Sequence, residues 1–151
     1  MKLQNTELLR TRNLIAGQWV DADAGGKLAV LNPASGDKLA DVPLCGADET
    51  RRAIDAANAA WPLWRSKTAK ERSIILRKWY DLLMANQDDL GRIMTAEQGK
   101  PLPEAKGEVA YGASFVEWFA EEAKRVNGET LPQFDNTRRL SVIKQPIGVC
   151  A

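Results

Sequence analysis

Helical periodicity of apolar residues dominates the middle of the chain, from Asp48 to Asn127. This block contains four segments in which apolar side chains recur every three or four residues, the spacing that places them on one face of a helix. Glycine and proline separate the segments, because both residues end helices. The chain is therefore predicted to form four amphipathic helices, and each needs a partner for its apolar face.

Capping residues mark the ends of these helices. Asp48 is predicted to be the N-cap of the first, and Pro62 should kink it near its end. The second opens on a capping box, the "TAKE" of residues 68–71. The third is expected over residues 87–97 and the fourth from 103 to an Asn-Gly end at 127–128.

Aromatic and aliphatic residues form the stripes that are expected to be buried. The first three helices carry Ile54, Ala57, Trp61 and Trp64, then Ile75, Trp79, Leu82 and Leu83, then Leu90, Ile93 and Met94. Four of the five tryptophans lie in the helical segments, largely at stripe spacing. A core role is therefore favoured over an aromatic cage or a base-stacking platform.

Composition excludes several kinds of chemistry. The chain has no histidine, so it contains no Ser-His-Asp or Cys-His pair and no histidine metal site. Asp88 and Asp89 are neighbours on one helix and point apart, so they should stabilise its N-terminus rather than act as an acid–base pair. The net charge of +1, without a block of like charge, argues against nucleic-acid binding.

The cellular setting is predicted from apolar runs and cysteines. No run approaches the length of about 18 apolar residues that a membrane helix needs. The opening "MKLQNTELLR" lacks the apolar core of a signal peptide. Cys45 and Cys150 are therefore expected to be reduced thiols in a cytoplasmic protein that has no membrane partner.

Strand patterns flank the helical block. Residues 14–44 predict two hairpins, the first with Gly17 at its bend and the second around the "NPASGD" turn, a connector rather than a ligand loop. Residues 137–145 alternate as a strand, Pro146 interrupts it, and "IGVCA" follows. A short apolar run of this kind is typical of a parallel strand buried on both faces and followed by a helix, so we expect the chain to be part of a longer one.

Three motifs in a fixed order resemble the aldehyde dehydrogenase superfamily, and more closely its NADP-linked succinate-semialdehyde dehydrogenases. They are the NP-x-SG turn at Asn32–Gly36, the E-x-GKP helix stop at Glu97–Pro101 and the P-x-GV strand at Pro146–Val149. The likeness covers essentially the whole chain, and the combination is specific to that family.

The resemblance implies an α/β parent with a Rossmann-like three-layer fold, of which this chain would be four amphipathic helices flanked by short β-strands. Residues 1–136 would be the helical part of the cofactor-binding domain with leading β-hairpins. Residues 137–146 would be an oligomerisation strand, and residues 147–151 the truncated first Rossmann-like strand. The family's oxyanion-stabilising asparagine, cofactor-contacting lysine, general-base glutamate and nucleophilic cysteine would all follow Ala151, so Cys45 and Cys150 are not expected to be the nucleophile.

The resemblance also implies site residues. One side of the family helix that lines the substrate tunnel is matched by Gly107, Tyr111, Phe115 and Trp118, and Tyr111 is the foremost candidate. Ordinary helix packing is the alternative for Phe115 and the favoured interpretation of Trp118. The carbonyls of Val30 and Leu31, together with Glu97, match a structural monovalent-cation site of the family. The alternative is that Glu97 is simply solvated. A subunit contact, or alternatively a hairpin within the subunit, is implied for Arg139, Leu140, Ser141, Val142, Ile143 and Lys144.

We therefore expect an incomplete amino-terminal piece of an NAD(P)-dependent aldehyde dehydrogenase. The parent would be a homo-oligomer that oxidises succinate semialdehyde, or a close acidic aldehyde such as glutarate semialdehyde, to the carboxylate with NADP or NAD. This chain alone is expected to hold no catalytic residue, to bind no cofactor and to be inactive. The rival hypothesis is a free-standing helical interaction or regulatory module derived from the same fold.

Overall fold

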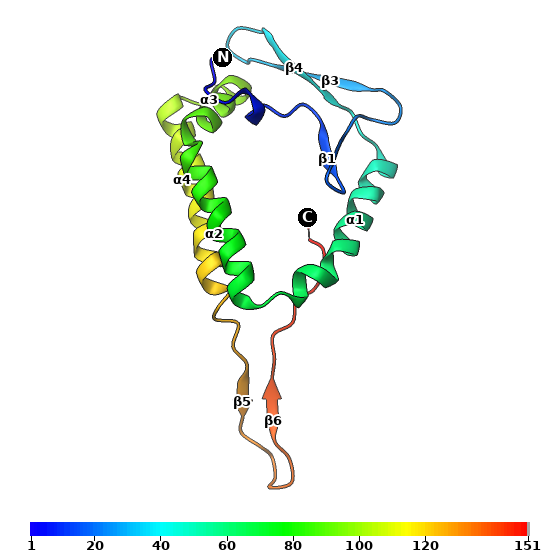
Figure 1. The fold of residues 1–151 in the computed structure, drawn as a ribbon, viewed down its shortest axis with the longest axis vertical. Helices are drawn as coiled ribbons and strands as arrows, with labels where there is room; N and C mark the ends of the chain where they lie inside the picture. The colour runs from blue at the N-terminus through cyan, green and yellow to red at the C-terminus, as the bar shows by residue number, and fades with distance from the viewer. Residues whose placement is uncertain (151) are drawn as a thin grey trace.

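The computed structural model describes residues 1–150. Its elements are η1 (Thr6–Leu8), β1 (Asn13–Ile15), β2 (Gln18–Val20), β3 (Lys27–Leu31), β4 (Lys38–Pro43), α1 (Ala47–Ser66), α2 (Ala69–Ala85), α3 (Gln87–Gln98), α4 (Leu102–Glu122), β5 (Glu129–Leu131) and β6 (Leu140–Val142). Helices α2, α3 and α4 gather on one side, α1 stands on the other, and the β5–β6 hairpin projects away from both (Figure 1). The mixed α/β composition, with four helices flanked by short strands, is as predicted.

Both leading hairpins are present. β1 pairs with β2 through a two-residue bend at Ala16 and Gly17, which both have positive φ. β3 pairs with β4 across the "NPASGD" turn, where the Asn32 side chain accepts a hydrogen bond from the Ala34 N–H at 2.9 Å. Gly36 closes this turn with a φ of 77°. Local turn chemistry therefore decides the positions of both bends.

The helix ends confirm some predictions and correct others. Thr68 and Glu71 form the predicted capping box, and Gly99 ends α3 in the left-handed conformation. Asp48 is not an N-cap, because α1 begins at Ala47 and Asp48 lies in its first turn. The N-cap is Gly46, whose N–H donates to the Glu49 carboxylate at 2.9 Å. Helix α1 continues past Pro62 to Ser66. The predicted end of α4 is wrong as well: it stops at Glu122, because residues 123–125 form tighter turns.

Small side chains hold the three-helix body together. The residues of α4 that are buried are Ala105, Val109, Ala113 and Ala120. They lie on one face of the helix, and their small volume lets α2 and α3 approach its backbone closely. Gly91 of α3 lies so near Lys106 that an added Cβ would meet the Lys106 Cγ at 2.7 Å.

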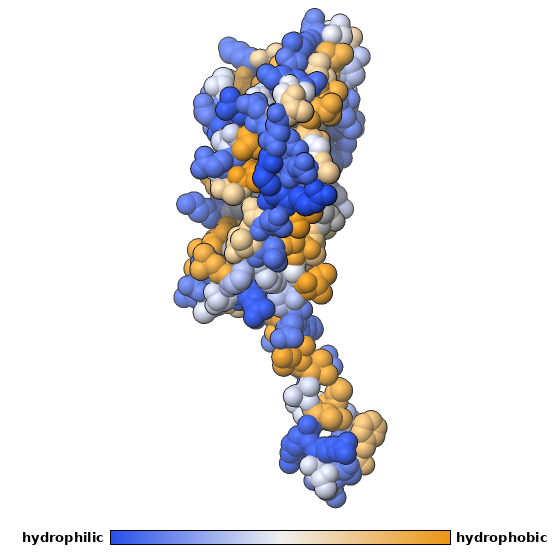
Figure 2. Space-filling model, turned by 90° about the vertical axis from the view of Figure 1, so that its right-hand side faces the viewer, coloured by the Kyte–Doolittle hydropathy of each residue, from blue (hydrophilic) through white to orange (hydrophobic). Residues whose placement is uncertain are grey.

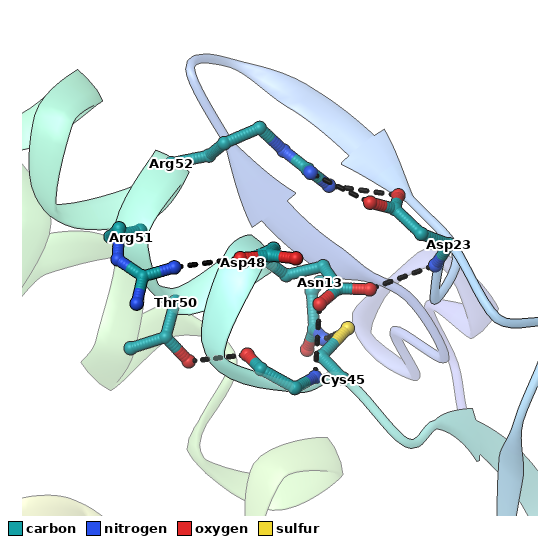
Figure 3. Close-up of polar contacts among 9 residues, drawn as sticks. Asn13, Asp23, Cys45, Asp48, Thr50, Arg51 and Arg52 are labelled. Carbon is teal, nitrogen blue, oxygen red and sulfur yellow. Dashed lines mark hydrogen bonds and ion pairs between the residues drawn. The ribbon is translucent and has the colours of Figure 1, made fainter.

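Two nearly buried carboxylates fasten the amino-terminal segment to the helices. Asp89, 4% exposed, accepts the backbone N–H groups of Gln4 and Asn5 at 2.7–3.0 Å. Glu49, 6% exposed, accepts the Asp23 N–H at 2.8 Å, and Arg52 binds the Asp23 carboxylate through two nitrogens (Figure 3). These N–H donors lower the pKa of Glu49, so the stability it contributes is present above its ordinary pKa and is lost as the pH falls through the lowered value.

The predicted buried stripes of α1 and α2 are partly exposed, whereas that of α3 is half-buried. Ile54 of α1 is 51% exposed, and Ile75, Trp79 and Leu82 of α2 are 44–55% exposed. Helix α2 packs the face around Ser73 against α4 instead. Its other apolar stripe, which carries Ile75, Trp79 and Leu82, therefore has no partner among residues 1–150. None of the large side chains in this range is fully buried: Trp61 and Trp64 are half-buried, whereas Trp79 and Trp118 are exposed, so the predicted core role is wrong for Trp79 and Trp118 in this chain by itself.

The surface area quantifies this openness. A compact monomer of 16.7 kDa should expose about 7,600 Å². The chain exposes 11300 Å², and apolar residues reach the surface along the helical body and the hairpin (Figure 2). No helix in the part of the chain that the structure describes is long and apolar enough to cross a membrane.

Residues 129–142 form a hairpin that the sequence only partly predicted. β6 pairs with β5 antiparallel, with Thr130 opposite Ser141. Residues 143–150 carry no regular secondary structure, and Cys150 is exposed rather than enclosed in apolar surroundings. The start of a core strand at residues 147–151 stays a prediction, and its last residue lies outside the described residues.

The close contact between α3 and α4 generates a test. Gly91→Ala should lower the free energy of unfolding, because overpacking costs about 1–3 kcal/mol whereas better helix propensity returns about 1 kcal/mol. Gly112→Ala on α4 is the matched control, since its added Cβ meets nothing within 4 Å and should stabilise the helix. Urea unfolding followed by circular dichroism measures both, and equal stability of the two variants would contradict the packing described here.

Candidate functional site

The exposed face of α4 carries the residues predicted to line a tunnel. Ala105, Ala113 and their buried companions occupy the opposite face of the helix, so Gly107, Tyr111 and Phe115 point away from the three-helix body. Tyr111 is 64% exposed and meets the Phe115 ring edge-to-face, with centroids 4.9 Å apart. This geometry is one that aromatic pairs favour. Gly107, Tyr111 and Phe115 thus lie on one exposed face of α4, and their lining of a substrate tunnel stays a prediction.

Gly107 and Tyr111 border a hollow of about 280 Å³. Its other lining residues are Lys100, Glu104 and Glu108, and the Lys100 ammonium is paired with the Glu108 carboxylate. Nothing lies within 4 Å of the position that a Gly107 Cβ would take, so the glycine leaves room beside the Tyr111 ring. The sequence does not predict the three charged residues as part of this hollow, because Lys100 lies in the stop after α3 and Glu104 and Glu108 lie at polar positions of α4.

Phe115 and Trp118 belong to a second hollow, of about 750 Å³, on the same helix. Arg77 of α2 dominates its polar side: it pairs with Glu117 at 2.8 Å and with Asp81 at 3.3 Å, and its guanidinium lies 4.7 Å from the centre of the Tyr80 ring. Trp118 therefore lines a different hollow from Gly107 and Tyr111, and Phe115, which lines the same hollow as Trp118, contacts the Tyr111 ring.

The predicted cation ligands lie near a contact between β3 and α3. An added Cβ on Gly99 would meet the Pro33 ring at 3.0 Å, so the end of α3 packs against the turn that follows β3. Glu97 and Leu31, each two residues before this contact, are exposed, and Val30 is half-buried. Within residues 1–150 no group of three or more acidic or cysteine side chains is placed to hold a metal.

Neither cysteine has the surroundings of an activated nucleophile. Cys45 is half-buried, and its sulfur accepts a hydrogen bond from the Asn13 side chain at 3.0 Å (Figure 3). Cys150 is exposed, and its thiol contacts the carbonyl of Gly148 at 3.7 Å. A base that could accept the proton of either thiol is not among their described hydrogen-bond partners.

Comparison with known proteins gives one consistent result. Residues 19–151 match the model of the aldehyde dehydrogenase family. The chain is 62% identical over 151 residues to succinate-semialdehyde dehydrogenase (NADP(+)) GabD of Escherichia coli strain K12, and covers 31% of that protein. It is 58% identical to glutarate-semialdehyde dehydrogenase of Pseudomonas putida and covers 32% of it.

A solved structure gives the same picture in three dimensions. The succinate-semialdehyde dehydrogenase from Burkholderia pseudomallei superimposes on 99% of this chain with a TM-score of 0.96 and 57% identity, and the match takes up 31% of that protein. The chain thus spans about a third of the length of the relatives it matches. With a family match that covers most of its residues, the chain belongs to the aldehyde dehydrogenase family.

Proposed function

We propose that this chain is the amino-terminal part of an NAD(P)-dependent aldehyde dehydrogenase that oxidises succinate semialdehyde, or a close acidic aldehyde, to the carboxylate. The observation that carries the proposal is identity at 62% along the whole chain to a protein of that name, of which the match covers 31%. The relative from Pseudomonas putida supports glutarate semialdehyde almost as well. Within this proposal the chain alone is inactive.

Exposed apolar surface supports the proposal against a free-standing module. A self-sufficient domain of this size buries its large apolar side chains, whereas the faces of α1 and α2 described above are open. In the proposed parent the rest of the subunit covers these faces. The same contact would give the exposed tryptophans the core role that their spacing predicts.

The part of the parent site that this chain would supply is one wall of the substrate tunnel. Tyr111 is its central residue, because the ring is exposed beside the open space at Gly107 and is held by its contact with Phe115. The Ser114 hydroxyl donates to the Tyr111 carbonyl at 2.7 Å, which ties the next turn of the helix to this residue. The wall would combine the Tyr111 ring with the charged side chains of Lys100, Glu104 and Glu108, so it could orient a polar substrate without reacting with it.

The nicotinamide cofactor, NADP or NAD, does not fit the residues described here. Dinucleotides bind where a parallel strand leads into a helix through a glycine-rich turn, and the strands within residues 1–150 form antiparallel pairs. No step of the reaction is therefore assigned to this chain. Its contribution is to shape the tunnel and to position the neighbouring parts of the subunit.

Two further features of the parent follow from the proposal. The packing of Gly99 on Pro33 brings the end of α3 next to the turn after β3, which supports a monovalent-cation site made by the Val30 and Leu31 carbonyls with Glu97.

The exposure of Val142 and Ile143, 45% and 70%, supports a subunit contact along Arg139–Lys144. In this contact the outer edge of β6 would pair with a neighbouring chain of a homo-oligomer, a dimer or a tetramer.

A chimera tests the proposed function. This chain replaces the aligned segment of the Escherichia coli relative, and the purified product is assayed for NADP reduction with succinate semialdehyde. The chimera should be active, because 62% identity preserves the contacts with the rest of the subunit. The 151-residue chain, assayed in parallel, should show no rate above the blank. A folded but inactive chimera, or an active isolated chain, would refute the proposal.

The tunnel wall gives a sharper prediction in the same chimera. Tyr111→Ala should raise KM for succinate semialdehyde roughly ten- to a hundredfold, because removing an aromatic wall loses roughly 1.5–3 kcal/mol of apolar contact. Tyr111→Phe should stay near the parent value, since it keeps the ring. Trp118→Ala is the control from the separate hollow. If Trp118→Ala raises KM as much as Tyr111→Ala does, the tunnel does not follow Gly107 and Tyr111.

A further inference from the structure

A cavity of about 470 Å³ lies at the junction between the end of α1 and the start of α2, and we name it the joint cavity. The segment after β6 runs beside the lower end of α1 (Figure 1), and its residues Lys144, Gln145 and Pro146 line one side of the cavity. Two half-buried indoles form its apolar wall. The lining residues are Trp61, Trp64, Arg65, Arg72, Val126, Lys144, Gln145 and Pro146, which include three cations and no carboxylate.

None of the three cations of the joint cavity pairs with a carboxylate within residues 1–150. Twelve of the 21 lysines and arginines pair with a carboxylate within residues 1–150, which leaves nine without such a pair. Four of the nine lie in residues 65–72, and two of these, Arg65 and Arg72, line the cavity together with Lys144. A cluster that the sequence alone does not show is thus completed by the fold.

The one acidic residue of this stretch is already engaged. Glu71 accepts the Thr68 backbone N–H at 2.7 Å and the Thr68 hydroxyl at 2.8 Å as part of the capping box. Arg72, in contrast, donates to the Lys67 carbonyl, a contact that fixes its guanidinium at the cavity. Arg65, Arg72 and Lys144 therefore place three like charges around one cavity, and these charges repel one another.

We propose that the joint cavity binds a small polyvalent oxyanion, a molecule with adjacent phosphate or carboxylate groups. Guanidinium groups bind such oxygens through paired hydrogen bonds, and an anion between Arg65, Arg72 and Lys144 would relieve their repulsion. The volume lies in the range of small-molecule sites. The inference is independent of the proposed aldehyde oxidation, because Tyr111 and Gly107 do not line this cavity.

Tryptophan fluorescence of the full 151-residue chain tests the proposal. Sodium pyrophosphate and sodium citrate are titrated separately at constant ionic strength, with sodium chloride as the compensating salt, so that the two arms distinguish phosphate from carboxylate. A saturable change in emission is expected with at least one of them. Trp61→Phe combined with Trp64→Phe should remove the change, and calorimetric titration of the same samples reports binding without relying on the indoles.

Matched variants locate the anion. Arg65→Gln and Lys144→Gln should each weaken binding about tenfold or more, since each removes one cation from the cavity. Lys78→Gln is the control: it removes an unpaired cation of α2 outside the cavity and should leave binding unchanged. The proposal is overturned if neither anion gives saturable emission or heat, if Lys78→Gln weakens binding equally, or if a penta-glutamate peptide binds at least tenfold more tightly than both anions.

Discussion

The close contact of α4 with α2 and α3 is the interaction on which the rest of the structure depends. Ala105, Ala113 and Ala120 have no exposed surface, and Gly91 leaves room for Lys106, whose Cγ would lie 2.7 Å from an added Cβ. Small residues on one face of α4 turn its larger residues to the other face, so the same packing that holds the body together also presents the Tyr111 ring. The Asp89 carboxylate then attaches the first residues of the chain to this body through their N–H groups.

The opposite half of the molecule has no comparable core. Helix α1 makes its main contact with β1, and Glu49 is its one buried residue within the described chain. The total surface of 11300 Å² is about half again what a compact chain of this mass would expose. The chain belongs to the aldehyde dehydrogenase family and spans about a third of the length of its relatives, and in the proposed parent the rest of the subunit would cover the open faces.

Local chemistry made much of the fold predictable. The bends at Gly17 and Gly36, the capping box at Thr68 and the stop at Gly99 each depend on a few neighbouring residues, and each is present. Burial was not predictable in the same way, because periodicity identifies an apolar stripe without showing which of two stripes is covered. For α2 the covered face is the one around Ser73. The charged lining of the Tyr111 hollow and the cations of the joint cavity likewise depend on segments that meet only in the folded chain.

The central claim is that α2, α3 and α4 form a packed body, whereas the half around α1 is open and would be covered by the rest of a subunit. Hydrogen–deuterium exchange tests this claim most directly. In the isolated chain, amides of α4 should exchange slowly and those of α1 rapidly, because few tertiary contacts oppose local opening of α1. In the chimera with the Escherichia coli relative, α1 should become as protected as α4. Equal and strong protection of both helices in the isolated chain would contradict the account.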